Sequence, residues 1–142
     1  MTLKGIVSAA TGIIGSAFAS LFGGWSTGLT TLLIFMCIDY ITGLVVAGVF
    51  KKSPKTANGA LESLAGFKGL IRKGATLLAV LVGYRLDMLL GTSYIRDCVI
   101  IAFITNEVIS ITENAGLMGV PMPQAIIKAI DILKGKENEK NA

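Results

Sequence analysis

Five polar residues interrupt the long apolar stretches of this 142-residue sequence, and they are its candidates for chemistry: Asp39, Arg85, Asp87, Asn106 and Glu107. A charged side chain at the centre of a bilayer costs about 2.5–3.5 kcal/mol on insertion scales, so such residues pair with one another or face water. Two interpretations follow from the residues alone. The five form either a polar cluster that only holds helices together, or a seam that lines a pore or an oligomer contact.

Other kinds of site find little support in the sequence. The chain has no histidine, and its two cysteines, Cys37 and Cys98, lie inside apolar runs. This composition excludes the usual His/Cys zinc sites and the histidine-based catalytic triads. The sequence also contains no CxxC, no phosphate-binding P-loop and no HExxH motif. We therefore expect no enzyme activity, no metal and no cofactor.

The composition indicates which elements hold the five residues. Hydrophobic residues make up 53% of the chain and charged residues only 15%, whereas about 25% is usual for charged residues in soluble domains. The mean hydropathy is +0.72. The sequence predicts an all-α integral membrane protein: a bundle of three to four transmembrane helices with short amphipathic cytoplasmic helices. Residues 1–134 form one membrane domain, with spans near 5–22, 28–50, 74–91 and 97–114.

The predicted spans place three of the charges at one depth. Asp39, Arg85 and Glu107 each lie 10 or 11 residues from the start of their span, which is about 15–16 Å at a helical rise of 1.5 Å per residue. That distance is half of a hydrocarbon core about 30 Å thick. Arg85 and Asp87 are two residues apart and point to opposite sides of a helix. Arg85 is therefore predicted to pair with Asp39 or Glu107.

Residues 5–22 allow three interpretations: a retained span, an amphipathic helix on the membrane surface, or a cleaved signal peptide. Small residues recur there at helical spacing, among them Gly12, Ser16 and Ser20. Such a stripe lets helices approach closely in lipid, so these three are predicted helix-packing residues.

A basic segment, residues 51–73, follows the second span. Its residues 56–72 are predicted to form an amphipathic surface helix or a solvated linker helix. By the positive-inside rule this loop is cytoplasmic, and the topology then places the C-terminus in the cytoplasm as well. Residues 123–134 are predicted to form a short amphipathic helix, and 135–142 a disordered polar tail. The basic residues of the loop are Lys51, Lys52, Lys55, Lys68, Arg72 and Lys73, against the single acid Glu62.

Over residues 30–134 the sequence resembles phage holins of the toxin-secretion/phage-lysis type. The order and spacing of several short segments carry the resemblance, and no single segment is specific. The segments are Asp39-Tyr40-Ile41-Thr42-Gly43, Lys51-Lys52, Ser63, Gly69-Leu70-Ile71-Arg72-Lys73, Asp87, Asn106 through Gly116 and Gly119-Val120-Pro121-Met122-Pro123.

The resemblance implies a small protein that assembles with copies of itself in the bacterial host's cytoplasmic membrane and opens holes. Through these holes an endolysin reaches the cell wall, and some relatives serve toxin release instead. The expected partners are the lipid bilayer, further copies of the chain and an endolysin, with no nucleic acid. Two other functions stay open: a small transporter or proton-conducting subunit, and a scaffold that binds and delays holins.

Overall fold

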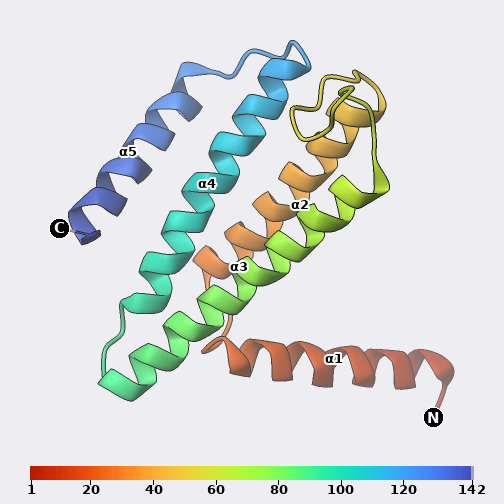
Figure 1. Ribbon diagram of the computed structural model, residues 1–142. Coiled ribbons are helices and arrows are strands. Elements are labelled where there is room, and N and C mark those ends of the chain that lie inside the picture. The colour runs from red at the N-terminus through yellow and green to blue at the C-terminus, as the bar shows by residue number, and fades with distance from the viewer. Residues whose placement is uncertain (142) are drawn as a thin grey trace.

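The computed structural model describes residues 1–141, with the backbone alone for 137, 140 and 141. This part of the chain is all-helical, as predicted, and contains no strand (Figure 1). Its five helices are α1 (Leu3–Leu21), α2 (Thr27–Gly48), α3 (Ser63–Leu90), α4 (Ile95–Leu117) and α5 (Gln124–Asn141).

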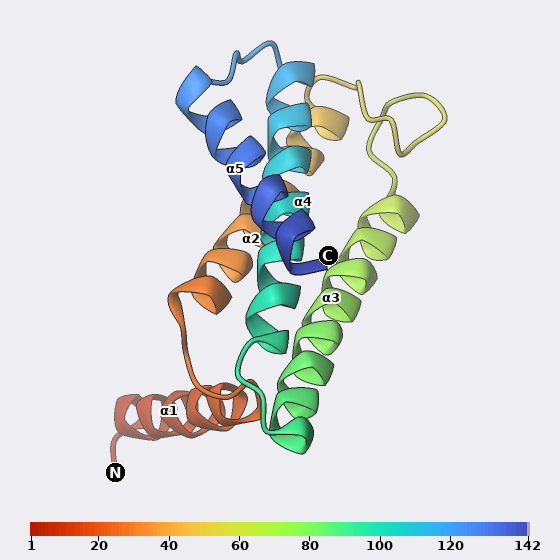
Figure 2. The same cartoon turned by 90° about the vertical axis from the view of Figure 1, so that its left-hand side faces the viewer.

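Helices α2, α3 and α4 form a bundle in which α4 is the central element. It packs against α2, α3 and α5, and Figure 2 shows it between α2 and α3. Because α3 runs antiparallel to the other two, the 49–62 loop and the 118–123 linker lie at one end of the bundle (Figure 1). We call this the loop end and the opposite end, where α1 lies, the α1 end.

The apolar core of the bundle lies toward the α1 end. Leu29, Leu32, Val80 and Ile100 are at most 1% exposed, and Phe22, Met36 and Ile104 complete the cluster. The bundle's outer surface is also apolar. Large side chains such as Ile41, Leu78 and Leu89 are more than half exposed, as expected for a protein whose surroundings are lipid rather than water.

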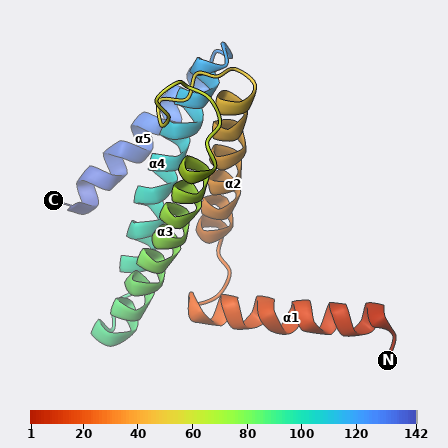
Figure 3. The same ribbon diagram turned by 45° about the vertical axis from the view of Figure 1, so that its right-hand side comes forward.

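Helix α1 lies across the axis of the bundle instead of along it (Figure 3). Ser26 caps the start of α2 by accepting a hydrogen bond from the Leu29 N–H at 3.1 Å. Gly23 and Gly24, with φ of +80° and +92°, make the corner between the two helices. Phe22 anchors this corner in the core at 5% exposure. This orientation favours the surface-helix interpretation of residues 5–22 over a span parallel to the other helices.

Within the described residues, two helices, α1 and α2, are long and apolar enough to cross a membrane, and not three to four as predicted. In α2 the mean hydropathy of the best 18-residue stretch is 2.1. Helices α3 and α4 carry charged residues along their length, such as Lys68 and Arg85 in α3 and Glu107 and Glu113 in α4.

The predicted surface helix at 56–72 is not a separate element: its residues 63–72 are helical but form the first turns of α3. Residues 51–62 are irregular, and α3 begins at Ser63, eleven residues before the predicted span. Gly59 has φ +76°, and a side chain there would collide with the Lys51 carbonyl. Asn58 accepts a hydrogen bond from the Ala60 N–H at 3.0 Å. This turn fixes the loop and prevents a helix before Ser63. No proline or turn then interrupts residues 63–73, so they join the predicted span in one continuous helix.

Helix α5 begins where predicted but runs to Asn141, so the described part of the tail is helical rather than disordered. Residue 142 lies outside the described residues. α5 lies beside α4 (Figures 1 and 2) and buries Ile130 to 7% exposure. Its charged residues Lys128, Asp131, Lys134, Lys136 and Glu139 are exposed.

Candidate functional site

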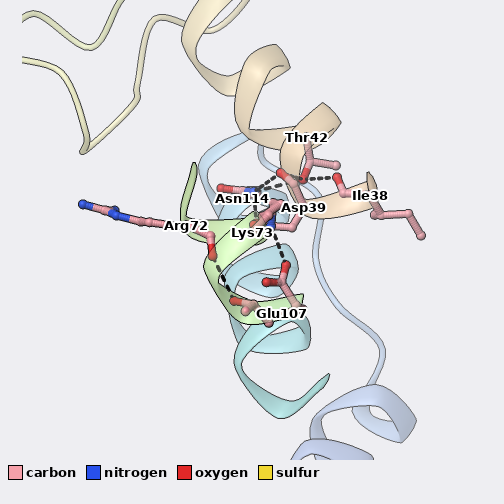
Figure 4. A network of polar contacts seen from close by, with 8 residues as sticks. Ile38, Asp39, Thr42, Arg72, Lys73, Glu107 and Asn114 are labelled. Atoms are coloured by element: carbon pink, nitrogen blue, oxygen red, sulfur yellow. Dashed lines mark hydrogen bonds and ion pairs between the residues drawn. The ribbon is translucent and has the colours of Figure 1, made fainter. Parts of the chain in front are cut away.

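Three charged residues from three helices meet inside the bundle (Figure 4). The Lys73 Nζ of α3 lies 2.8 Å from the Asp39 Oδ2 of α2 and 2.7 Å from the Glu107 Oε2 of α4. We call these residues the ion cluster. Their side chains are 15%, 9% and 12% exposed, respectively. The sequence correctly places Asp39 and Glu107 at one depth, but the cation between them is Lys73.

Two glycines of α3 face Tyr40 of α2 beside this contact. A Cβ atom on Gly69 would lie 3.6 Å from the Tyr40 ring, and one on Gly66 would lie 3.5 Å from its hydroxyl. The Tyr40 hydroxyl donates a long hydrogen bond to the Gly66 carbonyl at 3.4 Å. Lys73 follows Gly69 by four residues, one helical turn, so its side chain projects from the same face toward Asp39.

An amide from α4 fixes the position of the Asp39 carboxylate. The Asn114 Nδ2 donates to Asp39 Oδ1 at 3.1 Å, to the Asp39 carbonyl at 3.3 Å and to Thr42 Oγ1 at 2.9 Å. Thr42 in turn donates to the Ile38 carbonyl at 2.8 Å. The sequence analysis did not select Asn114 as a site residue. Its spacing was a usable signal, because it follows Glu107 by seven residues and so shares its helical face.

The ion cluster holds two carboxylates and one ammonium, so it carries one excess negative charge when all three are ionised. The desolvation cost of buried ions is offset only by close pairing and further hydrogen bonds. Asp39 has both, from Lys73 and Asn114, whereas Glu107 accepts a hydrogen bond from Lys73. The cluster thus depends on one lysine that two acids share.

The prediction that Arg85 pairs with Asp39 or Glu107 is wrong. Arg85 is exposed and donates to the Met88 sulfur at 3.7 Å. It follows Lys73 by twelve residues, which is about 18 Å along the helix and about 120° around it. Because α3 starts earlier than predicted, its cation at the level of the two acids is Lys73.

Asp87 is buried, but it belongs to the α1 end and not to the ion cluster. Its carboxylate accepts hydrogen bonds from the N–H groups of Ile95 and Arg96, at 3.0 and 2.9 Å, and from the Thr92 hydroxyl. These are unpaired N–H groups at the start of α4, where a negative charge is favourable. Asp87 therefore holds the α3–α4 turn in shape.

Arg96 then links this turn to α1. Its Nη1 donates to the carbonyls of Phe22 and Gly24 at 2.7 and 3.3 Å. Both carbonyls lie in the corner between α1 and α2, where no helical N–H is available to them. Asp87 and Arg96 together fix the position from which α1 leaves the bundle.

The other predicted residues lie apart from the ion cluster. Asn106 is exposed but lines the same cavity as the cluster. Gly12 of α1 has open space around it, so its role in helix packing stays a prediction, as do those of Ser16 and Ser20. Five of the six basic-loop residues are exposed at the loop end and Lys73 is not: Lys51, Lys52 and Lys55 lie in the loop, and Lys68 and Arg72 lie in the first turns of α3.

Comparison with known sequences places the chain in a family. Similar proteins include an uncharacterized 14.9 kDa protein in the nagH 3' region of Clostridium perfringens, 38% identical over 94% of this chain and 92% of the relative. An uncharacterized protein of Halalkalibacterium halodurans is 36% identical, over 89% and 93% respectively. One of Listeria innocua is 37% identical, over 89% and 88%.

No solved structure matches the chain. The sequence model of the bacteriophage holin family matches residues 16–135, which include α2, α3, α4 and the whole ion cluster. Most of α1 lies outside this match. The chain therefore belongs to the bacteriophage holin family.

Proposed function

We propose that the chain is a holin: it assembles with copies of itself in the host's cytoplasmic membrane and opens holes that release an endolysin. One observation carries the proposal beyond family membership. Asp39, Lys73 and Glu107 come from three helices of an otherwise apolar bundle and pair with one another inside it. Ionised residues within membrane helices line water or pair across helices, and this arrangement permits both, depending on how the helices pack.

In this proposal α2 crosses the membrane together with α3 and α4. Most charges of α3 and α4 lie in the ion cluster or toward the helix ends, whereas the exposed Arg72 lies directly before Lys73 and lines the same cavity. Lys73 and Glu107 are neutralised by pairing, Asp87 and Arg96 are satisfied at the α1 end, and Lys68 is near the start of α3. The five basic residues at the loop end make that end cytoplasmic by the positive-inside rule.

The two remaining helices then lie at opposite surfaces. Helix α1 crosses the bundle axis at the α1 end, so it lies along the external face of the membrane (Figure 3). Helix α5 begins at the loop end, on the cytoplasmic side (Figure 1). Its charged residues are not compatible with lipid. In the membrane α5 lies on the cytoplasmic surface, and the 118–123 linker, which contains two prolines, carries it away from α4.

Assembly uses the apolar outer surface of the bundle, and opening exposes the ion cluster to water. A hole needs polar walls, and Asp39, Lys73 and Glu107 are the charged residues at mid-height of these helices. If neighbouring chains separate the cluster's helices, each ion gains water in place of its partner. Closed oligomers and open holes are thus two packings of the same helices, and their relative population decides when lysis starts.

Inducible expression in a bacterium tests the proposal. We expect growth to continue for a fixed delay, then an abrupt loss of membrane potential, with lysis only when an endolysin is present in the cytoplasm. Lys73→Gln removes the shared cation and shifts the time of this event. Lys68→Gln removes an exposed lysine from the same helix and leaves the time unchanged.

Three results would contradict the proposal. Continued growth at full expression would favour a scaffold or a small transporter, and substrate-dependent flux in liposomes without cell death would identify the transporter. Equal timing for Lys73→Gln and Lys68→Gln would remove the ion cluster from the mechanism. Release of a large secreted protein from cells that stay viable would assign the chain to toxin export instead of lysis.

A further inference from the structure

A cavity of about 350 Å³ lies toward the loop end of the bundle. Its walls come from α2, α3 and α4, and the 49–62 loop covers it with residues Ser53–Thr56. At about 30 Å³ for each water in the liquid, this volume holds on the order of ten water molecules.

The ion cluster lies on the wall of this cavity. Asp39, Lys73 and Glu107 all line it, and Thr76 and Ser110 add hydroxyl groups near them. Three acids and three bases line the cavity in total, with Glu62, Lys55 and Arg72 as the other charged residues, so its charges balance. A cavity with this many polar partners is one that water fills.

The bundle is closed on the other side of the ion cluster. In each helix the core residues lie between the cluster and the α1 end: Leu32 and Met36 in α2, Val80 in α3, and Ile100 and Ile104 in α4. All are at most 8% exposed. A tightly packed apolar layer without polar partners stays dry and gives ions no path. We call this layer the plug.

We propose that each bundle is a half-channel, in which water from the loop end reaches the ion cluster and the plug stops it there. This inference rests on the proposed function only in that the bundle lies within a membrane. The closed protein is then already hydrated as far as Asp39 and Glu107. The ion cluster experiences the solution at the loop end, and a transmembrane potential falls across the plug.

Cysteine accessibility tests this arrangement. The two native cysteines are replaced in a Cys37→Ser, Cys98→Ser chain, and single cysteines are then introduced for a membrane-impermeant thiol reagent. Ser110→Cys reports on the cavity, Leu32→Cys on the plug, and Lys52→Cys on the side to which the loop is exposed. Labelling is measured in inside-out and right-side-out vesicles made from the same cells.

We expect Ser110→Cys to react from the same side as Lys52→Cys, at least about tenfold faster than from the other side, because thiol reactivity follows access. Leu32→Cys should not react from either side. No reaction of Ser110→Cys from the loop side would mean a dry or lipid-filled cavity and would overturn the half-channel. Reaction from both sides, or any reaction of Leu32→Cys, would overturn the plug.

The orientation control separates this inference from the proposed function. If Lys52→Cys reacts only from the external side, the cytoplasmic loop of the proposed function is wrong. A Ser110→Cys reaction from that same external side would still support the half-channel. If lysis fails in cells while the labelling pattern holds, the half-channel stands without the holin activity.

Discussion

Replacing Lys73 by methionine tests whether the ion cluster depends on one shared cation. Methionine keeps the length and apolar volume of the lysine stem but removes the ammonium group. Asp39 and Glu107 are each within 3 Å of that group in the structure. The variant therefore leaves two carboxylates that face each other in a largely buried site with no positive charge between them.

The structure sets the size of the expected effect. Two carboxylate oxygens that share one Nζ are about 5 Å apart, and two unit charges at that distance repel by about 3 kcal/mol at an effective dielectric of 20. Removing one partner of a buried ion pair commonly costs about 3–5 kcal/mol. We expect Lys73→Met to lower the free energy of unfolding by about 3–5 kcal/mol, because both estimates agree.

Glu107→Gln should cost about 1 kcal/mol or less, because it leaves Lys73 and Asp39 as a balanced pair and its amide oxygen can still accept from Lys73. In a Lys73→Met, Glu107→Gln double variant the repulsion disappears. The double variant should then be more stable than Lys73→Met alone by about 2–3 kcal/mol. A polar substitution would thus restore stability to a chain that has already lost its ion pair.

The assay is thermal unfolding in detergent, followed by the reaction of a thiol-specific dye with the half-buried Cys98 in a Cys37→Ser background. The midpoint of unfolding is compared among variants at equal protein concentration. Lys68→Met is the matched control, since Lys68 is exposed on the same helix. A Lys73→Met effect no larger than that of the control would refute the reasoning. So would strict additivity in the double variant.

Three further predictions use the same assay. Asp87→Asn should cost about 2 kcal/mol of stability because it weakens three hydrogen bonds to a charged acceptor. Its control, Asp97→Asn, alters a side chain that is 54% exposed and should change stability little. Equal effects of the two variants would contradict the capping role of Asp87. Arg96→Gln should cost about 1–3 kcal/mol because two carbonyls at the α1–α2 corner lose their donor; a silent change would mean that water replaces it. Gly83→Ala should cost about 1–3 kcal/mol because its Cβ would meet the Arg96 backbone at 3.3 Å. Gly74 lies in open space, so Gly74→Ala should stabilise α3 by about 0.5–1 kcal/mol. The reverse order of the two variants would refute the packing of α3 on α4.

The sequence was sufficient for the helical class and for the level of the two acids. Long apolar runs predict helices, because in lipid the backbone N–H and C=O groups must form hydrogen bonds with one another. Counting residues from the start of a run gives depth, which is why Asp39 and Glu107 were predicted at one level. Their positions on α2 and α4 follow from local spacing alone, because both helices begin within two residues of the predicted spans.

The cation of the cluster required tertiary information. Hydropathy places the start of the third span after the last charge of the basic segment, so Lys73 was predicted at the membrane surface and Arg85 near the middle. The helix actually begins after the turn at Gly59 and continues through Lys73, because a lysine that is paired with two acids need not end a buried helix. This pairing cannot be read from composition.

The contacts also indicate which helices would separate first in the proposed opening of the bundle. Near the loop end, α2 and α4 are joined by Asn114, whose amide reaches Asp39 and Thr42. The link between α2 and α3 there consists of the Lys73–Asp39 pair and one long hydrogen bond from Tyr40. The apolar core that holds all three helices lies beyond the ion cluster, toward the α1 end. Swinging the start of α3 away from α2 and α4 therefore breaks both ion pairs of Lys73 and the Tyr40 hydrogen bond, and water in the adjoining cavity lowers that cost. The opening motion with the lowest cost swings the start of α3 outward about the plug, and the shared lysine moves with it.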